Sequence, residues 1–171
     1  MINKNQLTER SFTPSQLSGF DGAHSIQLPV DFIHDLSKAD SLQAVLDTIA
    51  YWISHVFDAD RASITLQDTE EYLKLYSISG NHAIPMDFKI PIGQTFVGRV
   101  FACAKLIICD DLAQSDELDC KMLSEHGMGT CMDAPMVHNG VCIGTLNVAD
   151  INVNITTPYN KRFFYRASPH G

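Results

Sequence analysis

Five cysteines are the residues of this sequence with the widest chemical repertoire: Cys103, Cys109, Cys120, Cys131 and Cys142. Their number is odd and none forms a Cys-x-x-Cys pair, so the spacing favours neither a zinc site nor a secreted disulfide framework. We expect reduced thiols that pack as small buried hydrophobes. Cys120 and Cys131, with His126 between them, leave redox or metal chemistry as an alternative. Acidic neighbours such as Asp119 and Asp133 would oppose thiol catalysis, because negative charge raises the pKa of a thiol.

The aspartates offer a different chemistry, that of a polar ligand contact. Asp133 interrupts an apolar stretch with the pattern of a strand, and a carboxylate within a sheet costs free energy unless it is paired or hydrated. It either contacts a ligand or lies exposed near the start of its strand. Asp110 and Asp111 follow an apolar run, where they either contact a ligand or cap the next helix. The histidines are scattered, and a lone histidine on a helix, such as His55, is usually a packed or surface residue.

The overall charge and hydropathy limit the partners of the chain. The net charge is −8, whereas a nucleic-acid surface needs clustered Lys and Arg, so we expect no nucleic-acid partner. No apolar run approaches the ~20 residues that a membrane-spanning helix needs. The N-terminus has no basic and then apolar signal pattern. We therefore expect a cytoplasmic protein without a membrane contact.

Length and composition indicate a single domain with two tails. With 171 residues and 45% hydrophobic content, the chain can bury one sizeable core. We expect a polar, flexible N-terminal segment over residues 1–27 and a domain over residues 28–150. All 20 acidic residues precede residue 151, so residues 151–171 form a basic tail. A helix start at Thr157-Pro158 gives this tail only about two turns, too few to hold alone.

Apolar periodicity predicts helices and strands in a definite order. Leu42 to Phe57 have helical spacing after a cap at Asp40 or Ser41. Two shorter helices are predicted near residues 95–104 and 116–126. Strand patterns cover six stretches: residues 61–67, 72–78, 88–91, 106–109, 130–137 and 141–148.

The last two strands carry the strongest turn signal. Asn139-Gly140 between two apolar runs predicts a tight antiparallel hairpin. Strands that come in antiparallel groups, with helices inserted between them, indicate an α+β sheet with a helix layer rather than a doubly wound parallel sheet.

The ordered motifs resemble those of the GAF family over about residues 30–150. The resemblance rests on five pieces taken together: the helix from Leu42 to Phe57 followed by Ala59 to Ile64; Ile90-Pro91-Ile92-Gly93 with Val97-Gly98-Arg99-Val100; Ile107 to Asp111; Ala134-Pro135-Met136; and Asn139-Gly140 with Ile143-Gly144-Thr145-Leu146. The resemblance implies a six-stranded antiparallel sheet. It also implies helices on one face and, on the other, a pocket enclosed by loops and short helices.

The implied pocket lies between the sheet and the segments 80–98 and 110–131. Its candidate ligand-binding residues are Phe88, Thr95, Phe96, Asp110, Asp111, Thr130, Met132 and Asp133. The cofactor stays unidentified. Phytochrome-type GAF domains attach a bilin through a Cys-His dipeptide, and the cyclic-nucleotide-binding members carry an Asn-Lys…Phe…Asp-Glu signature. Neither pattern occurs in this sequence.

The resemblance implies a regulatory sensory domain in signal transduction, which binds a small ligand, catalyses nothing and works as a homodimer. In the family, a long C-terminal helix pairs with the first helix across the dimer and leads to an output domain. Two alternatives stay open. One is a GAF-fold dimerisation module without a ligand. The other is a thiol enzyme similar to the free methionine-(R)-sulfoxide reductases, whose cysteine would fall near Gly98-Arg99, where this sequence has none.

Overall fold

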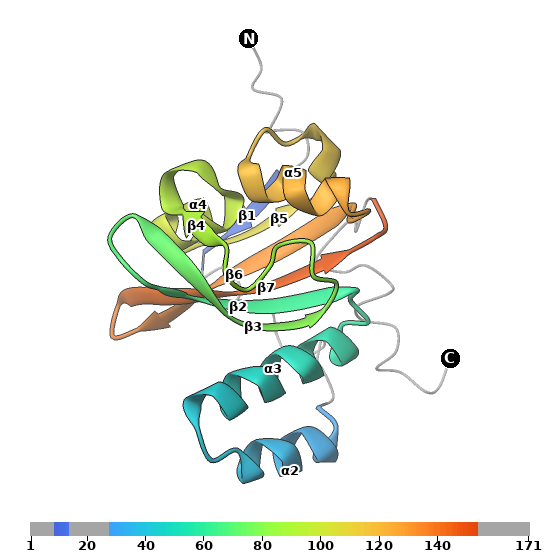
Figure 1. The fold of residues 1–171 in the computed structure, drawn as a ribbon, viewed down its shortest axis with the longest axis vertical. Coiled ribbons are helices and arrows are strands. Elements are labelled where there is room, and N and C mark those ends of the chain that lie inside the picture. The colour runs from blue at the N-terminus through green and yellow to red at the C-terminus, as the bar shows by residue number, and fades with distance from the viewer. Residues whose placement is uncertain (1–8, 14–27, 154–171) are drawn as a thin grey trace.

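A computed structural model describes residues 9–13 and 28–153. Within these residues the chain forms one seven-stranded sheet in the order β1-β5-β6-β7-β2-β3-β4, and every neighbouring pair is antiparallel (Figure 1). The predicted α+β class is therefore confirmed. The strands are β1 (Glu9–Phe12), β2 (Arg61–Gln67), β3 (Tyr72–Gly80), β4 (Lys89–Pro91), β5 (Leu106–Cys109), β6 (Thr130–His138) and β7 (Val141–Asp150).

Helices lie on both sides of this sheet. Helices α2 (Val30–Lys38) and α3 (Leu42–Val56) lie on one side, and α4 (Phe96–Cys103) and α5 (Leu118–Glu125) lie on the other (Figure 1). Two short 3-10 helices, η2 (Ile92–Gln94) and η3 (Leu112–Gln114), precede α4 and α5. No helix within the described residues is both long and apolar enough to cross a bilayer.

The seventh strand is β1, which lies inside the segment that the sequence predicts to be flexible. It pairs with β5 at the edge of the sheet, with Glu9 opposite Cys109. Two ion pairs fix it: Arg10 binds Asp110 at 2.7 Å, and Glu9 binds Arg99 at 2.8 Å. The prediction missed β1 because these four residues have no apolar alternation. Residues 1–8 and 14–27 of the predicted flexible segment, and residues 154–171 of the predicted tail, lie outside the described residues.

Helix α3 forms where the sequence predicts it and covers one face of the sheet. The Ser41 side chain caps it by accepting a hydrogen bond from the Ala44 N–H at 3.1 Å. Leu46 and Ala50 on its buried face pack with Ile64 of β2. Helix α2 packs outside α3 and has no buried residue of its own.

The β6–β7 hairpin also follows its sequence signal. Asn139 and Gly140 both have positive φ, 49° and 77°, as a two-residue hairpin turn with the twist of the strands requires. Gly144 has no room for a side chain, because a Cβ there would lie 2.1 Å from the Thr65 carbonyl oxygen. Pro135 is tolerated within β6 because β5 pairs with β6 only as far as Asp133.

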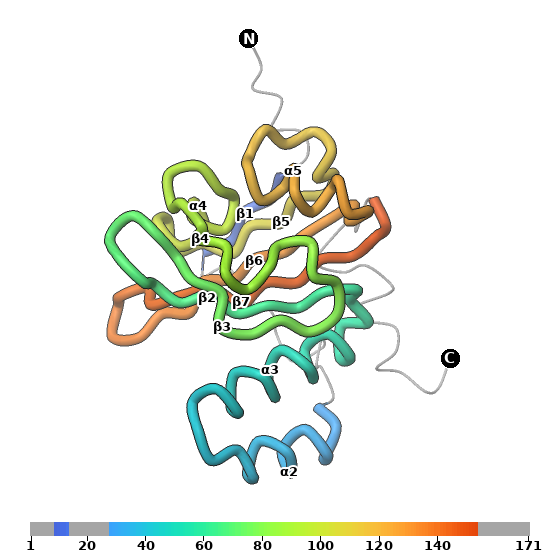
Figure 2. The backbone as a smooth tube through the Cα atoms, viewed as in Figure 1, coloured from blue at the N-terminus to red at the C-terminus, as the bar shows by residue number. Residues whose placement is uncertain are grey.

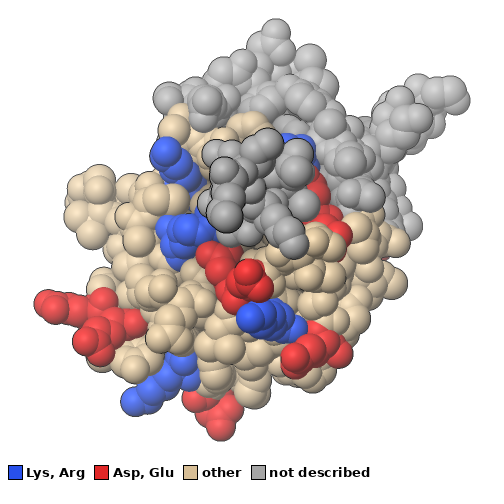
Figure 3. Space-filling view, turned by 90° about the horizontal axis from the view of Figure 1, so that it is seen from above, with Lys and Arg blue, Asp and Glu red and all other residues tan. Residues whose placement is uncertain are grey.

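The opposite side of the sheet holds the larger core. Here α4 begins at Thr95, whose hydroxyl accepts the Gly98 N–H at 3.1 Å, and Phe96 is fully buried. In Figure 2 the chain between β3 and β4 crosses in front of the middle of the sheet on this side. The sheet, this loop, α4 and α5 therefore surround a common space. On the surface shown in Figure 3, Lys and Arg side chains lie among Asp and Glu side chains and do not gather into one basic patch.

Candidate functional site

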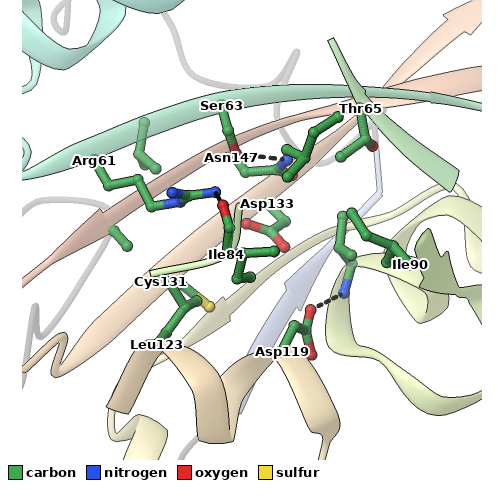
Figure 4. Close-up of a pocket in the computed structure, with 14 residues that line it drawn as sticks. Arg61, Ser63, Thr65, Ile84, Ile90, Asp119, Leu123, Cys131, Asp133 and Asn147 are labelled. Atoms are coloured by element: carbon green, nitrogen blue, oxygen red, sulfur yellow. Dashed lines mark hydrogen bonds between the residues drawn. The ribbon is translucent and has the colours of Figure 1, made fainter. Parts of the chain in front are cut away.

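A cavity lies between the sheet and the layer formed by the β3–β4 loop, α4 and α5 (Figure 4). It contains about 370 Å³ of empty space, part of it open to solvent. Its walls are formed by Arg61, Ser63, Thr65, Leu75, Ile84, Ile90, Val97, Asp119, Leu123, Cys131, Asp133, Asn147, Val148 and Ala149.

A row of polar side chains crosses the floor of the cavity. Asp133 of β6 is paired in register with Asn147 of β7, and Asn147 is paired with Ser63 of β2. Residues directly opposite each other in a sheet project on the same face, so all three reach the cavity (Figure 4). The Asn147 amide donates from Nδ2 to the Ser63 hydroxyl at 3.3 Å.

Asp133 is a buried carboxyl group without a hydrogen-bond partner among the described residues. Only 5% of the residue is exposed, although it lines the cavity. Burial raises the pKa of its carboxyl group well above the ordinary value of 3.8, and the negative charge of Asp119 adds to the rise. The positive charge of Arg61 opposes this shift without reversing it.

Asn147 adds a second unsatisfied acceptor beside Asp133. Its Oδ1 atom is buried and has no hydrogen-bond partner among the described residues. The Nδ2 atom of the same amide already donates to the Ser63 hydroxyl, so Oδ1 is the atom of this side chain that stays unpaired. Buried polar groups in native proteins are almost always hydrogen-bonded, so an unpaired acceptor beside a buried carboxyl group calls for an explanation.

Arg61 supplies the cationic group of the cavity and connects the sheet to the β3–β4 loop. It is 3% exposed, and its guanidinium donates to the carbonyl oxygens of Asn81 and Ile84. Burial lowers its pKa to about 10, and Asp133 partly opposes that shift. The group therefore stays charged at neutral pH, while part of its donor capacity holds the loop in place.

Asp119 is the second buried carboxylate, and in contrast to Asp133 it is fully engaged. It accepts hydrogen bonds from the N–H groups of Phe96 at 2.8 Å and Val97 at 3.0 Å, at the start of α4. It also accepts the N–H of Cys120. These bonds join α5 to α4, so Asp119 is a structural part of the cavity wall.

Three cysteines that are far apart in the sequence meet beside the cavity. Cys109 and Cys131 are register partners on β5 and β6, Cys120 comes from α5, and all three are buried. Thiol hydrogen bonds from Cys120 and Cys131 lower the pKa of Cys109. The same bonds to Cys109 raise the pKa of Cys120 and Cys131, and Asp119 and Asp133 respectively add to the rise.

The expectation of free, buried thiols is confirmed for these three cysteines but not for the other two. All five cysteines are free thiols, but Cys103 is exposed and Cys142 is half-buried. The described residues contain no group of three or more His, Cys, Asp and Glu side chains that could hold a metal ion. The sequence could not predict the cluster, because strand pairing and α5 bring its members together.

The structure places a cavity where the resemblance implies it, but only one of the eight candidate residues lines it. That residue is Asp133, which is buried rather than exposed at its strand end. Met132 is its neighbour in β6 and therefore points to the opposite face of the sheet. Thr130 is buried at the start of β6, with its hydroxyl unpartnered.

The remaining five candidates have structural partners elsewhere. Asp111 caps η3 through the N–H of Ala113, and Asp110 pairs with Arg10. The other three belong to the start of α4 or to the core packed around it: Phe88, Thr95 and Phe96.

The sequence prediction missed most of the polar cavity residues for one reason. In β2, Arg61, Ser63 and Thr65 alternate with apolar residues, which usually indicates one hydrated face. In the structure both faces of β2 are buried, so the same alternation produces a polar cavity floor. The alternation of polar and apolar residues in β2 was therefore the sequence feature that could have pointed to these cavity residues.

Comparisons with known proteins identify the fold. The model of the GAF domain family matches residues 41–166. The GAF domain of an Acinetobacter phosphoenolpyruvate-protein phosphotransferase superposes with a TM-score of 0.63 and 15% identity, covering 78% of this chain and 80% of that chain. The free methionine-R-sulfoxide reductase from Neisseria meningitidis, in complex with its substrate, gives a TM-score of 0.63 and 17% identity, covering 82% and 95%.

A third similar structure is the GAF domain of a phosphoenolpyruvate-protein phosphotransferase from Coxiella burnetii. Its TM-score is 0.62 at 17% identity, covering 71% of this chain and 74% of that chain. No curated protein sequence matches the chain. At these identities the structural similarities establish the fold alone. With the family model matching well over half of its length, the chain belongs to the GAF family, a family of sensory and regulatory domains.

Proposed function

We propose that this GAF domain is a regulatory sensor that binds a small molecule in the cavity between the sheet, α4 and α5. One observation carries the proposal: the buried carboxyl group of Asp133 and the Oδ1 atom of Asn147 both face the cavity, and this Oδ1 has no hydrogen-bond partner among the described residues. Leaving a buried polar group unpaired costs about 1 to 3 kcal/mol. A ligand that pairs with both groups recovers that free energy.

The sheet offers a route from the cavity to the opposite surface. Ser63 and Thr65 of β2 line the cavity, while Ile64 between them packs against α3. A shift of β2 on ligand binding would therefore move the surface on which α3 rests. We propose that α3 and α2 pass this change to a second copy of the chain in a homodimer.

Helix α2 has the surface expected of such a dimer contact. Val30 is 82% exposed and Ile33 is 55% exposed, on a helix with no buried residue. Apolar side chains gathered on one exposed helix mark an interaction surface. Sedimentation of the wild type and of Ile33→Glu tests this contact. We expect a dimer that dissociates in the variant, and an unchanged monomer in both would contradict it.

A thermal-shift screen tests ligand sensing. Cyclic nucleotides, haem, bilins and small metabolites are added singly to the wild type, to Asp133→Ala and to Asp68→Ala as an exposed control. We expect one class to raise the melting temperature of the wild type and the control but not of Asp133→Ala. No shift with any class, together with a cavity filled by side chains in a crystal, would favour a dimerisation module without a ligand.

Thiol catalysis is the second candidate, favoured by the cluster of Cys109, Cys120 and Cys131. The lowered pKa of Cys109 gives it the thiolate character that nucleophilic thiols need. The fold is shared with a free methionine-R-sulfoxide reductase. We propose that the domain is not an enzyme, because all three thiols are buried. Turnover of free methionine sulfoxide by the wild type that Cys120→Ser and Cys131→Ser abolish would contradict this.

A further inference from the structure

We propose that the ligand of this cavity carries a protonated primary amine, held by the carboxylate of Asp133 and the amide oxygen of Asn147. This inference rests on the proposed function, since it names the chemical class of the ligand for the same cavity. Asp133 and Asn147 are directly opposite in the β6–β7 register, so one donor group between them can reach both.

The floor of the cavity has more hydrogen-bond acceptors than donors. The Asn147 Oδ1 atom has no hydrogen-bond partner among the described residues, its Nδ2 donates to Ser63, and the Asp133 carboxyl group lines the cavity beside it. A primary ammonium group has three N–H donors and no acceptor. It therefore satisfies both vacant acceptors, whereas a carboxylate or phosphate would place further acceptors against them.

The charges of the cavity favour a cation for the same position. Asp119 accepts hydrogen bonds from three backbone N–H groups, and Arg61 donates to two loop carbonyl groups. Asp133 is the remaining ionisable group without such partners. A cation beside the Asp133 carboxylate gains a charge-assisted hydrogen bond in a poorly hydrated site.

The walls indicate an organic cation and not a metal ion. Leu75, Ile90 and Val97 line the cavity above the polar row, so a ligand must bury carbon atoms as well as its charge. Metal ions would need several carboxylate, imidazole or thiolate ligands, and the described residues offer no such group. A small aliphatic amine satisfies both the apolar walls and the polar floor.

Binding of a cation must change the protonation of Asp133. Without a cation beside it, burial favours the neutral acid and raises the pKa of Asp133. An ammonium group beside it favours the carboxylate, so ligand binding releases a proton. The affinity should consequently rise as the pH increases above 3.8 toward the raised pKa of Asp133, and fall once the amine itself loses its proton near pH 10.

The test compares three probes with the same carbon chain but different charges. We would titrate the full chain with n-butylammonium chloride, n-butanol and sodium butyrate, and follow the backbone amides of the cavity residues by NMR. We expect the ammonium probe to bind at least about tenfold more tightly than the alcohol, the size of one hydrogen bond to a charged group. Calorimetry in two buffers of different ionisation enthalpy should show proton release with this probe alone.

Variants assign the effect to the polar row. Asp133→Asn keeps the shape of the side chain and should abolish both the preference for ammonium and the proton release, whereas Asp68→Asn, on the exposed β2–β3 turn, should retain both. Asn147→Leu removes the second acceptor and should weaken the preference on its own. It also keeps the test decisive if Asp133→Asn fails to fold.

The outcomes separate this inference from the proposed function. Tighter binding of butanol or butyrate at the cavity would overturn the amine and leave a ligand-binding cavity in place. Equal binding of butylammonium to the wild type and to Asp133→Asn would also overturn it. If none of the three probes shifts the cavity amides, the amine inference fails, and the thermal-shift screen decides the proposed function independently.

Discussion

The two faces of strand β2 are equally buried but chemically opposite. On the α3 side, Ile64 is 1% exposed and packs with Leu46 and Ala50 of the helix. On the cavity side, Ser63 is 3% exposed and Thr65 is 1% exposed, and both are polar. Apolar burial on the α3 face therefore stabilises the fold. Burial of polar groups on the cavity face costs part of that free energy, because it removes them from water.

Under the proposed function, this difference separates stability from ligand binding within a single strand. The polar row Asp133-Asn147-Ser63 leaves the Asn147 Oδ1 atom without a partner among the described residues, and the proposed ligand would supply that partner. The α3 face holds the strand in position, so the cavity face can carry a polar floor. If this comparison is right, substitutions on the two faces should differ in size, in sign and in their dependence on pH.

The largest effect should come from the α3 face. Ile64→Ala removes a nearly fully buried side chain and leaves a cavity under α3, so we expect a loss of about 3 kcal/mol in the free energy of unfolding. Urea denaturation followed by circular dichroism measures it. Ile64→Val is the matched control, with an expected loss of about 1 kcal/mol. Equal losses for the two variants would contradict a closely packed face.

A somewhat smaller loss should come from the structural carboxylate of the cavity. Asp119→Ala removes the partners of the Phe96 and Val97 N–H groups at the start of α4, and we expect a loss of about 2 kcal/mol. Hydrogen exchange should increase first at those two amides. Unchanged protection of α4 would show that Asp119 does not hold it.

Asp133 should behave in the opposite way. Its folded-state pKa lies above the ordinary 3.8, so the folded protein binds the proton more tightly than the unfolded chain does. Its contribution to stability is therefore full below about pH 4 and is lost as the pH rises through the folded-state pKa. Asp133→Asn should be more stable than the wild type at neutral pH, by about 1 kcal/mol.

We would check this difference by thermal unfolding of both proteins between pH 4 and pH 8. The window begins near the ordinary pKa of an aspartate, about 4. The advantage of Asp133→Asn should grow with pH and be absent at the acid end. An advantage of the wild type that grows with pH would mean that the Asp133 carboxylate is paired in the folded state.

The smallest effect should come from the hydroxyl pair that joins β2 and β7. Thr65 and Thr145 share a hydrogen bond of 2.6 Å while both are buried. Thr65→Val leaves the Thr145 hydroxyl unpaired, with an expected loss of about 1 kcal/mol, whereas the double variant Thr65→Val, Thr145→Val should be nearly neutral. Additive losses from chemical denaturation of the single and double variants would contradict the pairing.

Local features of the sequence predicted the elements that depend on neighbouring residues. The Ser41 cap, the spacing from Leu42 and the Asn139-Gly140 turn each encode their structure within a few residues. The antiparallel sheet followed from the order of those elements. The edge strand β1 was missed because ion pairs with Arg99 and Asp110, nearly a hundred residues away, hold it.

The sequence by itself determined the fold family and the position of Asp133 within an otherwise apolar strand. Only the tertiary structure decided that Asp133 lies beside Asn147 and Ser63, and that three separate cysteines meet. The physical reason is strand register: pairing brings together residues such as Ser63 and Asn147, 84 positions apart, and no local pattern encodes which residues will be opposite. Burial of both faces of β2 then turned an ordinary polar alternation into the floor of a cavity.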